Sequence, residues 1–120
     1  IRKNVWYDPA PLPNIPGVDC IGRICDIGTK VAKQGLKKGD RVVALSRFLG
    51  GNARYVSVCA DNIVKVPETV DAVQGVCLVR TYLTAYQCLH RAGNRKFKKG
   101  DSVLVIGGNG AVAQAVIQLA

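Results

Sequence analysis

The sequence predicts an α/β fold class in which a β-rich first part passes through helices into one strand, one turn and one helix. Short apolar runs separated by glycines follow one another between residues 19 and 66, which is typical of strands. After residue 71 the apolar positions recur at a helical spacing. From residue 103 onward an apolar run leads into a glycine-rich turn and a run of small residues. These patterns predict a small β-barrel followed by the first strand and helix of a second domain.

Prolines mark an extended opening segment, because proline fixes φ and biases its predecessor away from helix. They are Pro9, Pro11, Pro13 and Pro16. Strands are expected to follow at residues 19–27, 41–45, 53–58 and 63–66. In the one or two helices after them, Asp71 or Thr69 would cap the first turn and Gly93 would end the last. The apolar positions of these helices are Ala72, Val76, Val79, Leu83 and Cys88.

The strand at 103–106 and the turn after it are typical of the opening of a dinucleotide-binding unit. Gly108 would permit the tight turn, Gly110 would let the backbone approach a pyrophosphate, and Ala113 would keep the helix close to its strand. The pyrophosphate would lie on the N-terminus of the helix, where backbone N–H groups are unpaired. The alternative is a plain strand–helix turn without a nucleotide. The expected cofactor-binding residues here are Gly107, Gly108, Asn109, Gly110, Ala111, Val112 and Ala113.

The chain is strongly basic, with 17 Lys and Arg residues against 8 Asp and Glu and a formal net charge of +9. Its basic residues concentrate at 30–41 and 91–99, where two stretches nearly repeat each other around Gly39-Asp40 and Gly100-Asp101. We interpret the repeat as one turn used twice, in which Gly supplies an unusual backbone angle and Asp bonds the local backbone. The lysines then lie on solvated turns. A basic nucleic-acid-binding module stays an alternative, although no aromatic residues interleave with the basic ones.

Five cysteines, an odd number without a CxxC pair, argue against a disulfide framework and a sulfur-rich zinc site. We expect most of them to be reduced core residues, and the compartment to be intracellular and cytoplasmic by default. No secretory or membrane-spanning segment is visible, although a targeting sequence upstream would not be seen. The cysteines are Cys20, Cys25, Cys59, Cys77 and Cys88.

Five short motifs follow one another along essentially the whole chain. They are PNIPGVDCIG at 13–22, GDRV at 39–42, GGNARY at 50–55, YLTAY at 82–86 and VLVIGGNGAVA at 103–113. In this order they resemble the medium-chain dehydrogenases/reductases, and among them the zinc-independent branch of quinone oxidoreductases and enoyl reductases.

The resemblance implies a GroES-like β-barrel catalytic domain joined to a Rossmann domain, with NAD(P)H bound between them. Residues 1–94 would be an incomplete GroES-like domain with its connecting helix, and residues 95–120 the truncated start of the Rossmann domain. A complete chain would transfer hydride, from NADPH rather than NADH, to a small-molecule quinone, enone or enoyl thioester, and would form a homodimer. We expect this piece alone to be inactive. A second alternative is a catalytically silent, reductase-like scaffold subunit.

No metal is expected. Zinc-dependent relatives carry a histidine ligand in a GHE sequence, which here reads Gly17-Val18-Asp19, and valine has no donor atom for a metal. The chain also lacks their loop of four closely spaced cysteines. The single histidine, His90, falls near the end of a predicted helix beside Arg91 and is interpreted as a solvated C-terminal residue.

Two further site residues come from the resemblance. Tyr7, or Trp6 if the spacing shifts by one, matches a tyrosine in the substrate cleft, where its O–H would polarise a carbonyl or donate a proton. The alternative is an aromatic residue packed on the rim of the barrel. Thr84 matches a threonine that contacts the cofactor near its nicotinamide end, and its alternative is a helix hydroxyl bonded to its own backbone.

Three residues depart from the family pattern. Arg54 stands where the family usually has glutamate, and the role of this charge does not follow from the sequence. Ala111 and Ala113 replace glycines of the nucleotide turn, and the methyl group of Ala113 falls where helix and strand must be close. We therefore expect reduced, but not abolished, cofactor affinity.

Overall fold

The structure is a computed structural model, and it describes residues 12–28, 35–46, 49–91 and 97–120. The chain divides into two compact units, Ile1–Val76 and Cys77–Ala120. The domain boundary predicted between residues 94 and 95 falls outside the described residues and stays a prediction.

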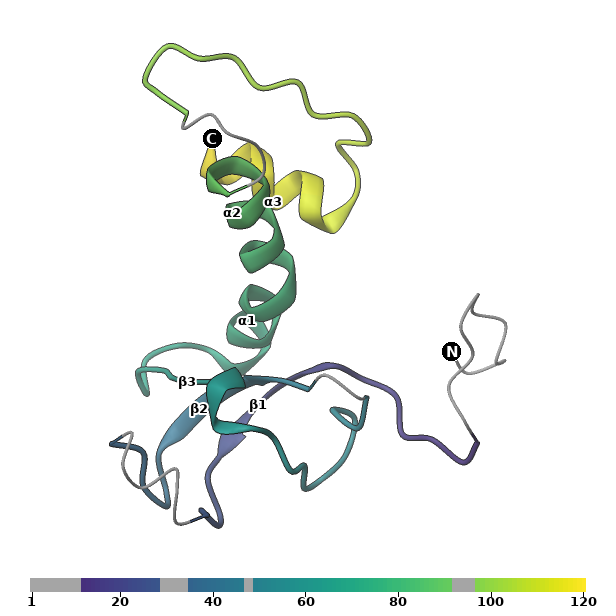
Figure 1. Cartoon of the computed structure of the whole chain (residues 1–120), viewed down its shortest axis with the longest axis vertical. Coiled ribbons are helices and arrows are strands. Elements are labelled where there is room, and N and C mark those ends of the chain that lie inside the picture. Colours follow the sequence, from purple (N-terminus) through teal and green to yellow (C-terminus); the bar gives the residue numbers. More distant parts are fainter. Residues whose placement is uncertain (1–11, 29–34, 47–48, 92–96) are drawn as a thin grey trace. The chain divides into compact units, whose positions relative to one another are not determined.

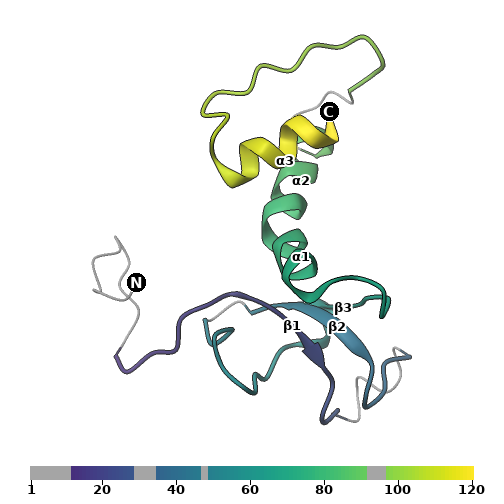
Figure 2. The same cartoon turned by 180° about the vertical axis from the view of Figure 1, so that it is seen from behind.

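The first unit is built on an antiparallel sheet (Figure 1). Its strands are β1 (Asp19–Arg23), β2 (Arg41–Leu45) and β3 (Ile63–Lys65), with β2 in the middle, as the view from behind also shows (Figure 2). On β2 the buried Val42 and Ala44 alternate with half-buried neighbours, which is the period-2 pattern of a sheet covered on one face. A short 3₁₀ turn, η2 (Ala60–Asn62), leads into β3.

The predicted strands differ in outcome. The strand at 41–45 is confirmed, and that at 63–66 is confirmed to within one residue. The strand expected at 19–27 ends at Arg23, although Ile24 still exchanges backbone hydrogen bonds with Asp40 and Gly39 (3.0 and 2.8 Å). The prediction of a strand at 53–58 is wrong, since this segment is irregular and mostly exposed. Ladder hydrogen bonds define a strand, and no partner strand lies beside this segment in the described part of the chain.

The turn predicted to occur twice is found at both places. Gly39 and Gly100 have φ of 87° and 95°, a left-handed backbone that favours glycine. In the first copy the Lys37 N–H donates to Asp40 Oδ2 (3.1 Å). In the second copy the N–H of Lys98 donates to Asp101 Oδ2 (2.9 Å). The basic residues therefore flank two copies of one local turn.

Helical structure occupies residues 72–90 without a break, as α1 (Ala72–Cys77), the π-helical segment η3 (Leu78–Tyr82) and α2 (Leu83–His90). Asp71 caps α1, because its Oδ1 accepts from the Gln74 N–H (3.0 Å). Gly93, the predicted stop, lies outside the described residues.

The buried positions of these helices are not those that the apolar period predicts. Gly75, Ala85 and Leu89 are buried, whereas Leu83 and Cys88 are exposed. A π-helical segment pairs residue i with i+5 instead of i+4, so it moves the faces of the helix that follows. An uninterrupted 3.6-residue period cannot anticipate this shift.

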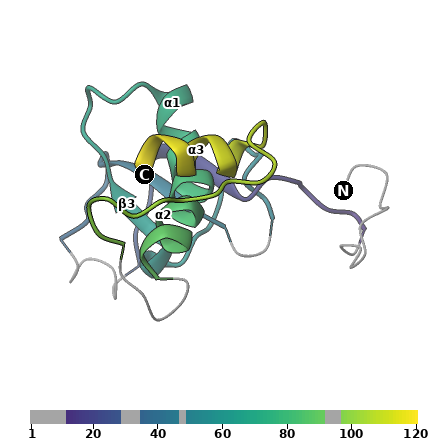
Figure 3. The same ribbon diagram turned by 90° about the horizontal axis from the view of Figure 1, so that it is seen from above.

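The second unit has its own small core. Helix α3 (Ala111–Leu119) packs on α2, as the view from above shows (Figure 3). Tyr82 and Val105 pack against this core, whose buried members are Ala85, Leu89, Ala115 and Val116. The strand predicted at 103–106 is not formed. Its Leu104 and Ile106 are 87% and 88% exposed, since no neighbouring strand accepts its hydrogen bonds in the described part of the chain.

The cysteines correct another expectation. Only Cys20 is half-buried, and its thiol donates weakly to the Ala44 carbonyl (3.6 Å). Burial, and next the charge of Asp19, raise the pKa of this thiol. The other four cysteines are exposed and form no disulfide, so the prediction of core residues is wrong for them. In α2, for example, Leu89 faces α3, and its neighbour Cys88 is turned about 100° away around the helix.

None of the helices in the described part of the chain has the length and the apolar composition of a membrane span.

Candidate functional site

The glycine-rich turn leads into α3 as the sequence predicts. Gly107 has φ of 78°, and its carbonyl accepts from the Gly110 N–H (2.9 Å). Gly110 is the N-cap of α3, with φ of −73° and ψ of 147°, and the first bond inside the helix runs from the Gln114 N–H to its carbonyl (2.9 Å). The left-handed backbone therefore lies at Gly107. We expected Gly108 to permit the tight turn, and its φ is not positive.

The N-terminus of α3 has the groups that an anion site needs. Because Gln114 makes the first bond inside the helix, the N–H groups of Ala111, Val112 and Ala113 have no partner within it. Ala111 is exposed and carries only a methyl group, so a pyrophosphate oxygen has room to approach these donors. A Cβ on Gly110 would lie 3.4 Å from the Gly107 carbonyl oxygen. This is an ordinary contact distance, and the φ of Gly110 is open to other residues, so neither requires glycine at the start of the helix.

Sequence reasoning missed Gln114. Its side-chain amide donates from Nε2 to the carbonyl of Gly108, six residues before it in the chain. A long amide in the first turn of a helix, four residues after its N-cap glycine, is the sequence signal that points to such a contact. No other side chain of the described residues is seen to hydrogen bond to this turn.

Thr84 is exposed on α2, in the same unit as the glycine turn. Its Oγ1 donates to the Arg80 carbonyl (2.7 Å), which also accepts the Leu83 N–H. This is the backbone-bonded hydroxyl that the sequence analysis kept as an alternative. Since the proton is used within the helix, the lone pairs of Oγ1 remain able to accept a hydrogen bond from a ligand. Thr84 is also the second residue after the π-helical segment, a feature frequent at functional sites.

The structure describes only one of the three remaining candidate residues, His90. Tyr7 and Trp6 lie outside the described residues. His90 is exposed at the end of α2, as predicted, with its ring centroid 4.5 Å from that of Tyr86. The described residues contain no group of three His, Cys, Asp or Glu side chains placed to hold a metal ion.

In the first unit, the structure brings together two of the motifs that are far apart in the sequence. The segment 50–52 runs beside the segment 15–17 and donates three backbone hydrogen bonds to it. They join Gly50 to Ile15 (2.7 Å), Gly51 to Gly17 (2.9 Å) and Asn52 to Pro16 (2.9 Å). The motifs at 13–22 and 50–55 therefore meet in one close backbone contact, and glycines of both motifs take part in it.

The same unit holds a cleft of about 630 Å³. Its walls are mainly apolar and come from β1, β2, the segment 51–58 and the start of α1. Arg54 and Tyr55 lie on it, with the Arg54 guanidinium 5.7 Å from the Tyr55 ring centroid, a cation–π distance. None of the predicted cofactor-binding residues lines this cleft, so it is not the site that the glycine turn and Thr84 indicate.

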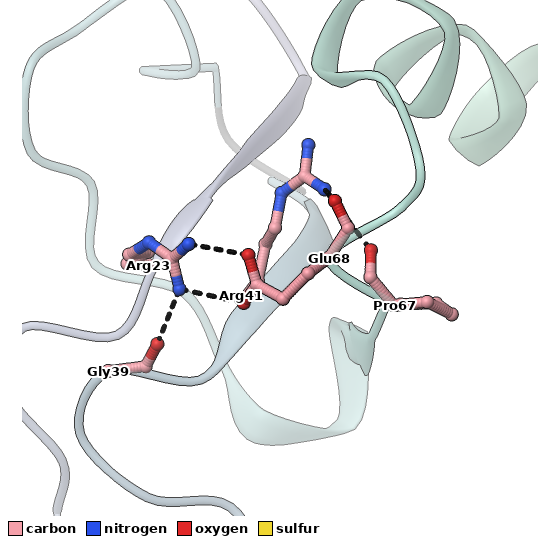
Figure 4. A network of polar contacts seen from close by, with 5 residues as sticks. All are labelled: Arg23, Gly39, Arg41, Pro67 and Glu68. Atoms are coloured by element: carbon pink, nitrogen blue, oxygen red, sulfur yellow. Dashed lines mark hydrogen bonds and ion pairs between the residues drawn. The ribbon is translucent and has the colours of Figure 1, made fainter.

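A polar network fixes the segment that leads into α1 (Figure 4). Arg23 binds both carboxylate oxygens of Glu68 (2.9 and 2.6 Å) and the Gly39 carbonyl (3.0 Å). Arg41 donates to the backbone carbonyls of Pro67 and Glu68 (3.1 and 2.9 Å). The hydrogen bonds from Arg23 hold the pKa of Glu68 below its ordinary value. The network thus attaches residues 67–68 to the ends of β1 and β2.

Comparison with known proteins gives the sequence motifs a context. Residues 1–68 match the family described as "Alcohol dehydrogenase GroES-like domain". The quinone oxidoreductase of Mus musculus is 38% identical over 120 residues, which are all of this chain and 35% of that protein. The 2-methylene-furan-3-one reductase of Solanum lycopersicum is 36% identical over 119 residues, which cover 92% of this chain and 29% of that protein.

A solved structure agrees with these matches. The native structure of a mycobacterial protein complexed with NADPH has a TM-score of 0.79 and 30% sequence identity, over 92% of this chain and 33% of that one. The chain therefore spans about a third of the length of the relatives that it matches.

Proposed function

Because the chain belongs to the alcohol dehydrogenase GroES-like domain family of the medium-chain dehydrogenase/reductase superfamily, we propose that the whole protein is an NADPH-dependent oxidoreductase. It transfers hydride to a small-molecule quinone, enone or enoyl thioester, and it does so without zinc. The observation that carries this proposal is the glycine turn at 107–110, which ends on the N-terminus of α3 with three backbone donors free for a phosphate. The named relatives, a quinone oxidoreductase and a furanone reductase, support the class of acceptor.

NADPH supplies the hydride when it is bound, and the chain's residues hold and orient it. The N–H groups of Ala111, Val112 and Ala113 bind its pyrophosphate, while Gly107, Gly108, Asn109 and Gly110 form the turn that admits it. Thr84 accepts a hydrogen bond near the nicotinamide end through Oγ1, whose own proton is bonded to Arg80. The NADPH complex of the mycobacterial relative supports NADPH as the dinucleotide.

Hydride transfer places negative charge on the acceptor oxygen, and a neutral donor is needed there when no metal is bound. We assign this role to Tyr7, whose phenolic O–H donates to the carbonyl oxygen and can pass its proton to it. Zinc independence is supported by Val18, which stands where zinc-dependent relatives have a histidine and offers no metal ligand.

The exposed strand residues support a larger Rossmann domain in the whole protein. Leu104 and Ile106 are 87% and 88% exposed, whereas strands of parallel sheets are buried on both faces. We propose that residues 95–120 begin a cofactor domain whose further strands cover these side chains, and that residues 1–94 belong to the barrel domain with its connecting helix.

The proposal is tested by adding NADPH and a small enone to the whole purified protein and following absorbance at the nicotinamide band. We expect NADPH to be oxidised in step with loss of the enone C=C, at an unchanged rate after dialysis against a metal chelator. With a simple alcohol and NAD no reduction is expected. Alcohol oxidation that the chelator abolishes would contradict the proposal, as would a protein that binds no dinucleotide.

A further inference from the structure

We propose that Gln114 is a positioning residue for the cofactor turn: its side-chain amide holds the turn in the conformation that presents backbone N–H groups, and not a carbonyl oxygen, to the pyrophosphate. This inference rests on the proposed function, because it concerns the same NADPH site. It adds a side chain to the pyrophosphate end of this site, which is otherwise made of backbone.

The contact joins the first turn of α3 to the middle of the glycine turn. Gln114 Nε2 donates to the Gly108 carbonyl, while the Gln114 backbone N–H donates to the Gly110 carbonyl (2.9 Å). One residue thus ties both Gly108 and Gly110 to the helix. The turn is closed further by the bond from the Gly110 N–H to the Gly107 carbonyl (2.9 Å).

The turn needs such a tie because its backbone is unusually free. Three of its four residues are glycines, which have more conformations available than any other residue. A Cβ on Gly108 would meet only Ile117 Cδ1, at 3.9 Å, so packing against neighbouring atoms leaves this residue little restricted. A hydrogen bond from a side chain that is anchored in a helix reduces this freedom before the ligand arrives.

The tie also has an electrostatic consequence. A carbonyl oxygen carries partial negative charge and would repel a phosphate that approaches the helix N-terminus. With its oxygen engaged by the Gln114 amide, the Gly108 carbonyl is held toward α3. The donors of Ala111, Val112 and Ala113 then face the anion without a competing acceptor from Gly108.

Gln118 provides a matched comparison in the same helix. It has the same side chain one turn further on, but its Oε1 accepts from the Tyr82 hydroxyl and it makes no bond to the glycine turn. Methionine keeps the length and the helix propensity of glutamine and removes its hydrogen-bonding amide. Q114M and Q118M therefore each remove one side-chain amide of α3 and its hydrogen bond, but only Q114M removes a hydrogen bond to the turn.

The experiment uses the whole protein and measures three quantities for the wild type, Q114M and Q118M. They are the Kd for NADPH by fluorescence titration, kcat at saturating NADPH, and the exchange rate of the Gly110 amide hydrogen without NADPH. For Q114M we expect a Kd raised about 3- to 10-fold, the factor that one neutral hydrogen bond represents. Its kcat should be unchanged, and its Gly110 exchange faster by a similar factor. Q118M should match the wild type in Kd and in Gly110 exchange.

The outcomes separate this inference from the proposed function. A wild-type protein that binds NADPH, with Q114M equal to it in Kd and Gly110 exchange, would overturn the inference and leave the function intact. If the wild type binds no NADPH, the proposed function fails, and the exchange rates alone decide whether Gln114 holds the turn. Equal losses in Q114M and Q118M would show that either substitution merely weakens α3, which also overturns the inference.

Discussion

At the scale of single residues, glycine has two distinct roles in the first unit. Gly17 has φ of 95°, a conformation that other residues rarely adopt. Gly51 has no such angle, but a Cβ built on it would lie 3.0 Å from both the Asp19 carbonyl oxygen and the Gly17 carbonyl carbon. Glycine is needed at position 51 because it has no side chain, which lets the backbones of the two motif segments approach each other closely. The two roles lead to different responses to substitution.

Replacing Gly51 with alanine should destabilise the whole protein by about 1–3 kcal/mol, the usual cost of inserting a methyl group where neighbours cannot move aside. Both neighbours are backbone atoms, so no side chain can rotate out of the way. Thermal and urea unfolding of the variant measure the effect. Gly22→Ala is the control: nothing lies within 4 Å of its Cβ, and its stability should stay equal or rise by less than about 1 kcal/mol. Equal stability of the two variants would refute the close contact.

The sequence predicts individual residues well where a local rule applies. It anticipates the Asp71 cap and the Asp side chain of the repeated turn, since each depends on atoms within about four residues. It fails for the exposed cysteines, because exposure depends on which surface of the fold a residue reaches. The left-handed backbone lies at Gly107 and not at Gly108 for another reason: three glycines in four positions allow several turns, and the hydrogen bonds from Gly110 and Gln114 hold one of them.

At the scale of elements, the repeated turn shows how context changes the energetics of one local structure. Asp40 and Asp101 each accept a backbone N–H from the residue three before them. Asp40 is also only 7% exposed and pairs with Lys65 Nζ (2.8 Å) from β3. The first copy therefore joins the turn to the sheet through a buried carboxylate, while Asp101 is half-buried in the second unit.

Asp40→Asn should lower the thermal midpoint more than Asp101→Asn, and by an amount that depends on pH. The hydrogen bond from Lys65, with the Lys37 N–H, holds the pKa of Asp40 below its ordinary value. Because the pKa is lower in the folded state, this stabilisation is complete above about pH 4, the ordinary value for aspartate. It is lost as the pH falls through the folded-state pKa.

Thermal unfolding of wild type and Asp40→Asn at several values between about pH 7 and pH 2 tests this. The difference between their midpoints should be constant near neutrality and shrink toward zero as the acid limit is approached. A difference that grows on acidification would mean that the pKa of Asp40 is raised on folding, the opposite of the direction given by its contacts. Asp101→Asn is the control for the hydrogen bond of the turn itself.

Elements are predictable from the sequence when their partners are close in the chain. The strand at 41–45 pairs with strands on both sides and is found where it was expected. The apolar run at 103–106 has the composition of a strand, but its neighbours in a parallel sheet would come from sequence-distant βα units. The π-helical segment was not predicted either, although its hydrogen-bond partners are close in the chain. Apolar periodicity carries no signal for one wider turn of a helix.

At the scale of the whole molecule, the two units share a feature that sets them apart from a complete small domain. Large apolar side chains are exposed in both, among them Val64 and Val73 in the first unit and Leu104 and Ile106 in the second. Exposed side chains of this size are the kind that another surface covers when a larger domain is complete. Because the chain spans about a third of the length of its relatives, we attribute the exposure of Leu104 and Ile106 to further strands of the proposed cofactor domain.

This attribution makes an unusual prediction for two residues that are almost fully exposed here. In the whole protein, Leu104→Ala and Ile106→Ala should each lower the free energy of unfolding by about 2–5 kcal/mol, the range for truncating a buried Leu or Ile. Substitutions of truly exposed residues change stability by no more than about 0.5 kcal/mol. Chemical unfolding of the two variants distinguishes the cases, and NADPH binding should weaken with stability, since Val105 between them packs on the core that carries α3. If both variants unfold like the wild type, no sheet covers the segment 103–106, and the glycine turn would lack the scaffold that a dinucleotide site requires.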